Sequence, residues 1–475
     1  MQVRVRGVAL LDCFIIMIEV GGKNMVFSRE SLELMDELGE LLKERKISPD
    51  LYSQYNVKRG LRNSDGTGVL VGLTEVGDVH SYEFVDGKKV SVPGQLRYRG
   101  YNVKDLVRNS EKEGRFGFEE TCYLLLFGEL PTRQRLDEFN ELLSDFRPLP
   151  YGFTEDMILK APSKDIMNKL TRAVLASYSY DTNPDCTSID NVLRQCIELI
   201  ARFPTMVAYG YQAKIHYHDN ESLYIHNPQP HLSTAENILH MIRPDSKYTR
   251  QEAELLDVAL TIHAEHGGGN NSTFIVNVAS STGTDTYSAI AAAIGSLKGP
   301  LHGGANAMVL AMMEDIKANV KDWEDKDEVA AYIEKILRKE AFDGSGLVYG
   351  MGHAVYTLSD PRAILLKQKA IELAKEKEMD KEFNLYASIE ELTPSIFAKV
   401  RGVEKEMCAN VDFYSGFVYN MLGIPNELHT PIFAIARIAG WCAHRVEELI
   451  SGGKIIRPAY RNVSSTRDYI KIDQR

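Results

Sequence analysis

Residues 249–267 read TRQEAELLDVALTIHAEHG, and this stretch specifies one helix from its first turn to its end. Thr249 and Glu252 form a T-x-x-E capping box, which predicts that the helix begins there. Gly267 predicts that the helix stops after about His266, because glycine readily adopts the left-handed conformation that ends helices. Patterns of this kind recur along most of the chain.

Helical spacing of apolar residues continues from about residue 102 to the C-terminal end, with Gly and Pro mostly between the segments. Residues 28–45 have the same spacing. Residues 68–98 differ, because short alternating runs broken by Val-Gly-Asp and Asp-Gly predict small strands and hairpins. We therefore expect a mainly α protein with a minor β element, with helices at 102–112, 118–127, 133–145, 164–178, 189–214, 234–242, 249–264, 285–297, 305–320, 326–339, 360–376, 380–399, 412–422, 428–450 and 466–471.

The composition of the 475 residues is typical of a globular protein, with 44% hydrophobic and 25% charged residues. A formal net charge of −11 argues against nucleic acid or an anionic membrane as the main partner. The cysteines form no CxxC pair, which indicates reduced, buried thiols in a cytoplasmic protein. They are Cys13, Cys122, Cys186, Cys196, Cys408 and Cys442.

The first residues need separate treatment. Residues 8–18, VALLDCFIIMI, follow two arginines as the apolar core of a signal peptide would. Asp12 interrupts this run, which is also too short to span a bilayer. Because Met25 begins a patterned helix, we expect residues 1–24 to be a dispensable extension.

Four stretches place polar side chains among glycines or at helix ends, where a ligand can reach them. In the first, HAEHGGGNNST (263–273), His263 and His266 are predicted to share a helix face near the negative end of the dipole. Metal ligands, anion contacts and a simple C-cap all remain open. The glycines and asparagines that follow favour a ligand, because they offer backbone N–H groups and amides.

The second stretch, GPLHGGAN (299–306), holds His302 just before a predicted helix. The positive end of that helix disfavours an imidazolium, so we expect a neutral His302 that donates a hydrogen bond. Its flanking glycines predict close approach of a ligand or a backbone segment.

The third stretch, YGMGHAVYTLSDPRA (349–363), places His353 after a glycine-rich loop and Arg362 at a helix N-terminus. An arginine is unfavourable for the dipole at that position, which indicates that it faces an anion. In the fourth, NVDFYSG (410–416), Asp412 lies between apolar residues. Partial burial would raise its pKa towards that of a general base, although an N-cap role fits equally well.

Arginines accompany these groups in the C-terminal half, including Arg437 and Arg457. Guanidinium groups bind carboxylates bidentately, so the set favours an anionic substrate with several carboxylates. The alternative is a zinc or iron site, but the spacings match no metal motif. That alternative would use His266, His302, His353 and Asp412.

In their order along the chain, these stretches closely resemble the motifs of citrate synthases. The matching segments are LRYRGYNVKDL (96–106), HAEHGGGN (263–270), GPLHGGAN (299–306), YGMGHAV with DPR (349–362), NVDFYSG (410–416), ARIAGW (436–441) and IIRP (455–458). Several ordered motifs over two hundred residues are far more specific than any one alone. The resemblance covers most of the chain from about residue 68 and implies an all-helical fold of two domains.

The resemblance also implies a role for each matching residue. Asp412 is similar to the base that removes a proton from the acetyl-CoA methyl group, and His302 to the neutral donor that holds the enol(ate) oxygen. His353 is similar to the histidine that polarises and protonates the oxaloacetate carbonyl. The expected oxaloacetate contacts are His266, Asn270, Arg362, Arg437 and Arg457. The expected coenzyme A contacts are Leu347, Val348, Gly350, Met351 and Asn410.

No metal or redox cofactor is implied, and the expected partners are oxaloacetate, acetyl-CoA and a second copy of the chain that receives Arg457. The resemblance implies a large domain over residues 25–303 and 423–475, with a small domain over 304–422 that closes on the substrate. One departure is Thr357, because many relatives carry a Lys or Arg there as a contact to a CoA phosphate.

Three other functions remain open at this point. A 2-methylcitrate synthase would use propionyl-CoA with the same chemistry, and one methylene group changes selectivity by only ~1–3 kcal/mol. A non-catalytic sensor of CoA or dicarboxylates would have the fold without the chemistry, but Asp412 and His302 are both present. A metal-dependent lyase or hydrolase is the third.

Overall fold

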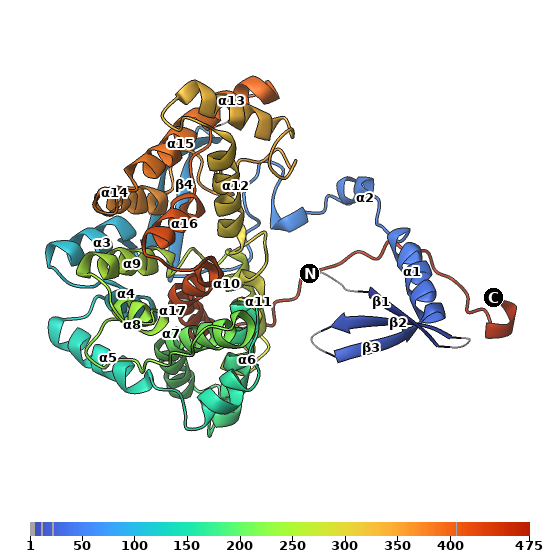
Figure 1. Cartoon of the computed structure of the whole chain (residues 1–475), viewed down its shortest axis with the longest axis horizontal. Helices are drawn as coiled ribbons and strands as arrows, with labels where there is room; N and C mark the ends of the chain where they lie inside the picture. The colour runs from blue at the N-terminus through green and yellow to red at the C-terminus, as the bar shows by residue number, and fades with distance from the viewer. Residues whose placement is uncertain (1–4, 11–12, 21–22, 405) are drawn as a thin grey trace. The chain divides into compact units, whose positions relative to one another are not determined.

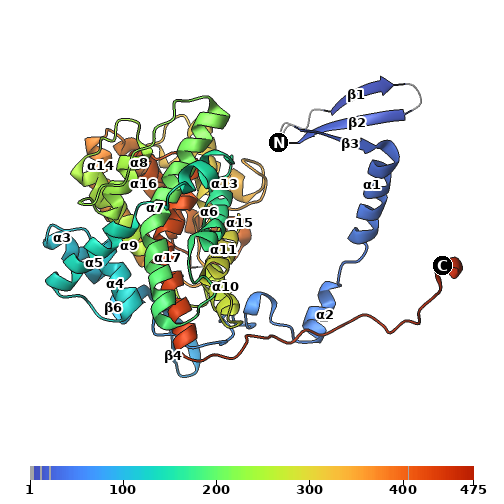
Figure 2. The same ribbon diagram turned by 90° about the horizontal axis from the view of Figure 1, so that it is seen from below.

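The computed structural model describes residues 5–10, 13–20, 23–404 and 406–475 (Figures 1 and 2). The chain divides into two compact units, Met1–Val71 and Gly72–Arg475. No helix of the described ranges is long and apolar enough to cross a membrane.

The first unit is a small antiparallel sheet followed by helices. Its strands β1 (Val5–Leu10), β2 (Cys13–Val20) and β3 (Lys23–Ser28) pair in sequence order. They are followed by α1 (Arg29–Lys43) and α2 (Pro49–Gln54), and then by the 3-10 turn η1 (Arg59–Leu61).

The expected helix of residues 28–45 is therefore confirmed, but the expectation that Met25 begins it is wrong. Met25 pairs with Ile18 in the sheet. Residues 1–4, 11, 12, 21 and 22, including Asp12 of the apolar run, lie outside the described part of the chain. The dispensability of residues 1–24 stays a prediction.

The second unit begins with the predicted β element. Strands β4 (Gly77–Val85) and β5 (Lys88–Tyr98) form an antiparallel hairpin, and β6 (Tyr101–Asn102) extends it. The hairpin turns at Asp86 and Gly87, whose φ angles of 52° and 75° are both positive. Asp-Gly suits this turn because both positions need the left-handed region.

All but one of the predicted helices after residue 102 are present. They are α3 (Val103–Lys112), α4 (Phe118–Phe127), α5 (Arg133–Phe146), α6 (Ile166–Ser177), α7 (Ile189–Asp219), α8 (Thr234–Ile242), α9 (Arg250–His263), α11 (Thr286–Leu297), α12 (Ala305–Asn319), α13 (Lys326–Leu337), α14 (Pro361–Glu376), α15 (Asp380–Arg401), α16 (Val411–Met421) and α17 (His429–Ile450). The mainly α class is confirmed.

Two helix predictions need correction. Helix α10 (Asn271–Ser280) was missed, because its Asn, Ser, Thr and Val residues are weak helix formers. The expected helix at 466–471 is wrong. Only the short 3-10 turn η5 (Ile472–Gln474) forms near it, and Tyr469 and Ile470 are exposed, so no packing stabilises a helix there.

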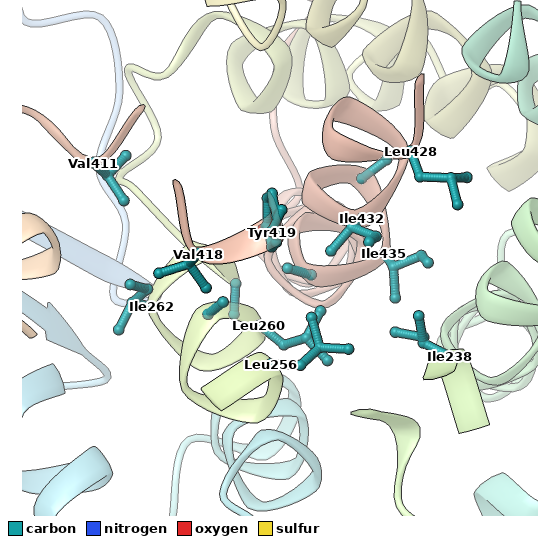
Figure 3. Close-up of a cluster of buried hydrophobic side chains, with 14 of the residues drawn as sticks. Ile238, Leu256, Leu260, Ile262, Val411, Val418, Tyr419, Leu428, Ile432 and Ile435 are labelled. Atoms are coloured by element: carbon teal, nitrogen blue, oxygen red, sulfur yellow. The ribbon is translucent and has the colours of Figure 1, made fainter. Parts of the chain in front are cut away.

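The core of the second unit surrounds α17, which packs against α4, α7, α9, α10 and α11. Figure 3 shows Leu256 and Leu260 of α9 on one side of this core and Ile432 and Ile435 of α17 on the other. All four side chains are buried. Burial of one such side chain contributes about 1.5–3 kcal/mol, so this packing fixes α9 against α17.

The thiols are less uniform than the sequence predicts. Cys122, Cys196 and Cys442 are buried and Cys408 is half-buried, but Cys186 is exposed. The hydroxyl and backbone of Ser188 lower the pKa of Cys186. The side chain of Cys13 lies outside the described part of the structure.

A buried carboxyl on α9 gives a pH-dependent prediction for stability. Asp257 accepts the backbone N–H groups of Gly117 and Phe118 at 2.7 and 3.2 Å. Burial and the nearby Glu119 raise the pKa of Asp257 to about 8. An unfolded aspartate has already lost its proton above about pH 5, so the folded state binds the extra proton between that pH and 8.

The free energy of unfolding should therefore fall as pH rises towards 8, by up to about 1.4 kcal/mol per pH unit from this group. The window between about pH 6.5 and 8 is cleanest, because histidines buried in the neutral form titrate lower. Asp257→Asn should flatten the slope measured by urea unfolding. Asp325→Asn is the control, because it makes the same exchange at an exposed N-cap of α13, where the amide oxygen can also cap the helix. An unchanged slope in Asp257→Asn would contradict the assignment.

Candidate active site

The capping box of Thr249 and Glu252 is confirmed, but α9 ends at His263, three residues before the expected end. His263 and His266 consequently do not share a helix face. The Nδ1 atom of His263 bonds to the Ala259 carbonyl oxygen at 2.7 Å, and burial lowers the pKa of His263 to about 3. His263 is thus a neutral structural residue.

His266 lies in the loop after α9 and is buried, with 8% of its surface exposed. Its ring centroid is 5.2 Å from that of His353 and 5.6 Å from that of Tyr356. Burial, with the charge of Arg362, holds the pKa of His266 well below its usual value. Its Nε2 atom has no hydrogen-bond partner among the described residues. A ligand oxygen would satisfy this atom.

His353 lies in the loop before α14 and stacks on Tyr356 at 4.8 Å between ring centroids. Its Nδ1 atom accepts the backbone N–H groups of Val355 and Tyr356, both at 3.0 Å. Because Nδ1 is an acceptor, the proton of the neutral ring is on Nε2. The backbone therefore fixes His353 as an Nε2 donor.

Arg362, in the first turn of α14, is 3% exposed and not a solvated surface charge. The anion that it faces in the structure is Asp360, the N-cap of the same helix. Its Nε and Nη2 atoms donate to the two Asp360 oxygens at 3.0 and 2.7 Å. Asp360 also accepts the backbone N–H of Val411 at 3.1 Å, which joins α14 to α16.

Arg437 on α17 is fully buried, and only its Nε atom is used, as a donor to the His263 carbonyl oxygen at 2.7 Å. Neither Nη atom has a hydrogen-bond partner among the described residues. Burial lowers the pKa of Arg437 to about 10, so the group is still a cation at neutral pH. The guanidinium lies 4.8 Å from the centroid of the Phe433 ring, but within the described residues no carboxylate pairs with this buried charge, so both Nη atoms are available to a ligand carboxylate.

Asp412 is the second residue of α16, and the N-cap of this helix is Asn410, whose side-chain oxygen accepts the Asp412 N–H at 3.0 Å. The alternative N-cap role of Asp412 is therefore wrong. Burial raises the pKa of Asp412 to about 6, although the Arg362 guanidinium acts in the opposite direction. The expected rise is confirmed, and a carboxylate of this pKa can act as a general base near neutral pH.

His302 precedes α12, as expected. Burial, with the positive charge of Arg437, lowers the pKa of His302 to about 4, which confirms the neutral imidazole. Its Nε2 atom and the Ser272 hydroxyl are hydrogen-bonded at 3.1 Å, and Trp441 Nε1 donates to the same hydroxyl at 3.2 Å. Ser272 and Trp441 lie within the quoted stretches HAEHGGGNNST and ARIAGW, but neither was singled out as a candidate site residue.

The glycines beside His302 allow the close approach of backbone segments, one of the two alternatives that the sequence predicts, while ligand access stays a prediction. A Cβ atom on Gly303 would lie 2.7 Å from the carbonyl oxygen of Leu297, and one on Gly304 would lie 2.9 Å from Pro300 Cα. These residues are required by the tight turn between α11 and α12. The backbone geometry of this turn sets the position of His302.

The loop of residues 347–352 packs against residues 408–410. The backbone N–H of Asn410 donates to the Gly350 carbonyl oxygen, and its side-chain nitrogen donates to that of Gly352, both at 2.8 Å. Gly350 has φ +80°, and a Cβ there would lie 3.0 Å from Phe413 Cα. Met351 pairs with Ala409, while Leu347 is exposed and Val348 is buried. This loop is thereby fixed next to the start of α16.

The charge of Arg437 acts on His266, His302 and Asp412, so these groups lie around one guanidinium. Asn270 is the N-cap of α10, four residues after His266, and its Oδ1 atom accepts the Ser272 hydroxyl at 2.9 Å. Arg457 does not join this cluster. It is exposed in the extended segment after α17.

The metal interpretation gains no support from the geometry. Within the described residues, no three His, Cys, Asp or Glu side chains are grouped to hold a metal ion. The hydroxyl of Thr357 is buried and has no hydrogen-bond partner in the described part of the chain. Because residue 357 is a threonine, this position has no positively charged side chain to bind a CoA phosphate.

Comparison with known proteins gives a consistent result. A family model described as citrate synthase, C-terminal domain, matches residues 65–459. The citrate synthase of Haloferax volcanii is 35% identical over 424 residues, which cover 88% of this chain and 99% of the relative. The 2-methylcitrate synthase 1 of Corynebacterium glutamicum is 35% identical over 432 residues, 89% of this chain and 100% of the relative.

Among solved structures, the citrate synthase of Thermoplasma acidophilum in a ternary complex with carboxymethyl coenzyme A and oxaloacetate has a TM-score of 0.71. It is 29% identical, and the match covers 88% of this chain and 99% of that one. The likeness extends over both the fold and nearly the full length of each relative.

Proposed function

The chain belongs to the citrate synthase family, and on that premise we propose that it condenses acetyl-CoA with oxaloacetate and water to give citrate and CoA. The observation that carries this proposal is Arg437, a fully buried guanidinium whose Nη atoms have no hydrogen-bond partner among the described residues. Its charge acts on Asp412, whose pKa is raised, and on the neutral His302. A carboxylate anchor, a base and a neutral donor are what this condensation requires.

Oxaloacetate binds through its carboxylates and its ketone. Arg437 binds one carboxylate bidentately through its two Nη atoms, and His266 and Asn270 provide further polar contacts. Arg362 contributes its positive charge and its remaining Nη1 atom, since Asp360 uses the other two nitrogens. His353 directs its Nε2 proton at the ketone oxygen, because the backbone amides occupy Nδ1.

Acetyl-CoA is activated by a division of work between two groups. Asp412, as the carboxylate, removes a proton from the methyl group, and the electron pair moves towards the thioester oxygen. His302 donates a hydrogen bond to that oxygen. The Ser272 hydroxyl holds the Nε2 atom of His302 at 3.1 Å, which fixes the orientation of the ring and leaves Nδ1 as the nitrogen that faces the substrate.

The new carbon–carbon bond forms when the enol(ate) carbon attacks the ketone carbon of oxaloacetate. His353 gives its Nε2 proton to the ketone oxygen, which becomes the hydroxyl of the citryl thioester. Water then adds to the thioester carbon, the carbon–sulfur bond breaks, and the thiol leaves as CoA. The loop 347–352 and Asn410 are proposed contacts of CoA. Thr357 provides no positive charge to bind a CoA phosphate.

The proposed assembly is a cytoplasmic homodimer without metal or redox cofactors. An exposed Arg457 on an extended segment supports its insertion into the partner's site. The proposed small domain, 304–422, contributes His353 and Asp412, and its closure over residues 25–303 and 423–475 would exclude water before condensation.

Oxaloacetate-dependent thiol release from acetyl-CoA and propionyl-CoA tests the activity. We expect kcat/KM to favour acetyl-CoA by about 10- to 200-fold, with full activity after exhaustive chelation. Relatives of both specificities share the family, so a preference for propionyl-CoA would reassign the enzyme as a 2-methylcitrate synthase. Binding of both ligands without thiol release would indicate a sensor, and inactivation by the chelator a metal-dependent enzyme.

The pKa of Asp412 sets an acid limb for the reaction. Below about pH 6 the carboxyl gains a proton and cannot accept one from the methyl group, so kcat/KM for acetyl-CoA should fall about tenfold per pH unit. His302 stays neutral down to about pH 4 and does not contribute in this range. Rates between pH 5 and 8 at saturating oxaloacetate check this, and a flat profile would contradict it.

A further inference from the structure

Three hydrogen bonds join one face of α17 to three consecutive residues at the end of α9. They run from Arg437 Nε to the His263 carbonyl oxygen at 2.7 Å, from the Gly440 N–H to the Ala264 carbonyl oxygen at 3.2 Å, and between His444 Nε2 and Glu265 Oε1 at 3.1 Å. The α17 residues are spaced by three and four, so they share one helix face.

These contacts explain why α9 ends early. The sequence contains no helix breaker before Gly267, so a helix to His266 is the local preference. The carbonyl groups of His263 and Ala264 instead accept donors from α17, which replaces hydrogen bonds that a continued helix would make. His266 is thereby outside the helix, with its Nε2 atom unpartnered among the described residues.

The third contact is a buried hydrogen bond, because Glu265 and His444 are both almost inaccessible to solvent. Burial alone would raise the pKa of Glu265, but the charge and hydrogen bond of His444 hold it below its usual value. Arg437 is a further positive group near this carboxylate, and Glu447 faces the other ring nitrogen of His444 at 3.8 Å.

The fold leaves room for the Glu265 carboxylate and for little else. A Cβ atom on Gly440 would lie 2.3 Å from its Oε2 atom, and one on Gly77 of β4 would lie 2.7 Å from its Cγ atom. The Tyr98 hydroxyl shares its hydrogen between the carbonyl oxygens of Thr261 and Glu265, at 3.0 and 3.2 Å. The residue preceding His266 is thus fixed on both its side chain and its backbone.

We propose that the Glu265–His444 pair is a positioning element that holds His266 in register with Arg437. Neither member of the pair touches the substrate in this assignment. The pair acts through His266, which follows Glu265 in the chain, and through Arg437, two turns before His444 on α17. The ligand is the oxaloacetate of the proposed function, on which this inference rests.

The arrangement also leaves Arg437 available. Glu265 is the carboxylate whose charge acts most strongly on Arg437, yet within the described residues no ion pair joins the two. Arg362, by contrast, has two of its nitrogens occupied by Asp360. A counter-charge held by His444 at a distance stabilises the buried guanidinium and keeps both Nη atoms free for a carboxylate.

The test compares His444→Leu, which removes the donor, with His444→Gln, which keeps one. We expect His444→Leu to raise the KM for oxaloacetate by about ten- to a hundredfold, because the two substrate-binding segments lose their register. The KM for acetyl-CoA should change by no more than about twofold, and His444→Gln should recover most of the loss. Calorimetric titration with oxaloacetate should show the same order of dissociation constants.

Arg445→Met is the matched control. Arg445 is the next residue on α17, is also buried, and donates to Ser280, Thr284 and Thr286 rather than to the end of α9. Arg445→Met should lower the thermal midpoint without raising the KM for oxaloacetate relative to the KM for acetyl-CoA. If His444→Leu does not fold, Glu265→Gln replaces it, with an expected rise of about threefold for oxaloacetate.

An active wild-type enzyme whose folded His444→Leu variant binds oxaloacetate normally would overturn the inference. Equal increases in both KM values, or the same selective increase in Arg445→Met, would also overturn it. A wild-type protein that releases no thiol would instead refute the proposed function. The oxaloacetate titration would still show whether the pair positions the binding site.

Discussion

Replacing Asp412 by asparagine should lower kcat for citrate formation by about 10²- to 10⁴-fold, the range that loss of a positioned general base produces. Asparagine has nearly the same shape as aspartate, so the α16 N-terminus and its Asn410 cap remain. The amide cannot accept the methyl proton. Oxaloacetate should still bind within about threefold of the wild-type affinity, because its carboxylate contacts are on other elements.

A thiol-release assay measures kcat, and calorimetric titration measures the affinity for oxaloacetate, both on the same preparations. Asp380→Asn is the control, because Asp380 is also an acidic residue in the first turn of a helix, α15, but is exposed. It should leave the rate unchanged. An Asp412→Asn enzyme that keeps more than about a tenth of the wild-type kcat would show that another group is the base.

Arg437→Met should separate binding from stability. The substrate carboxylate loses a fully desolvated partner, which costs about 2–5 kcal/mol and weakens oxaloacetate binding by at least about thirtyfold. The free protein should lose little stability, because removal of a buried cation whose Nη atoms have no partner among the described residues offsets the loss of the Nε bond to the His263 carbonyl oxygen.

Arg362→Met should have the opposite effect on stability. It leaves the buried Asp360 carboxylate without its guanidinium partner, so it should lower the thermal midpoint as well as oxaloacetate affinity. Thermal unfolding of both variants without substrate, beside their oxaloacetate titrations, checks this difference. A loss of stability in Arg437→Met as large as that in Arg362→Met would contradict the proposed ligand role of Arg437.

Sequence reasoning identified the parts of the site that depend on local chain geometry. The environments of His302 and Asp412 follow from nearby helix ends and apolar neighbours. In the structure the pKa of His302 is lowered and that of Asp412 is raised, as the sequence predicts. The Asp360 partner of Arg362 was also visible in the sequence, two residues away in DPR, but was not considered. These signals lie within a few residues of the groups that they affect.

The rest depends on contacts between distant segments. Ser272 meets Trp441 across 169 residues, and Glu265 meets His444 across 179. The early end of α9 has the same origin, because α17 supplies the donors that stop it. No local propensity encodes such contacts, and for that reason the predicted shared face of His263 and His266 was wrong.

The most direct test of the account uses acetyl-CoA whose methyl group carries three deuterium atoms. If Asp412 removes one methyl proton and the resulting carbon attacks oxaloacetate, the citrate formed must retain two deuterium atoms by mass spectrometry, with one CoA released per citrate. Acetate that retains all three, released with CoA in the absence of citrate, would show simple thioester hydrolysis and contradict the account.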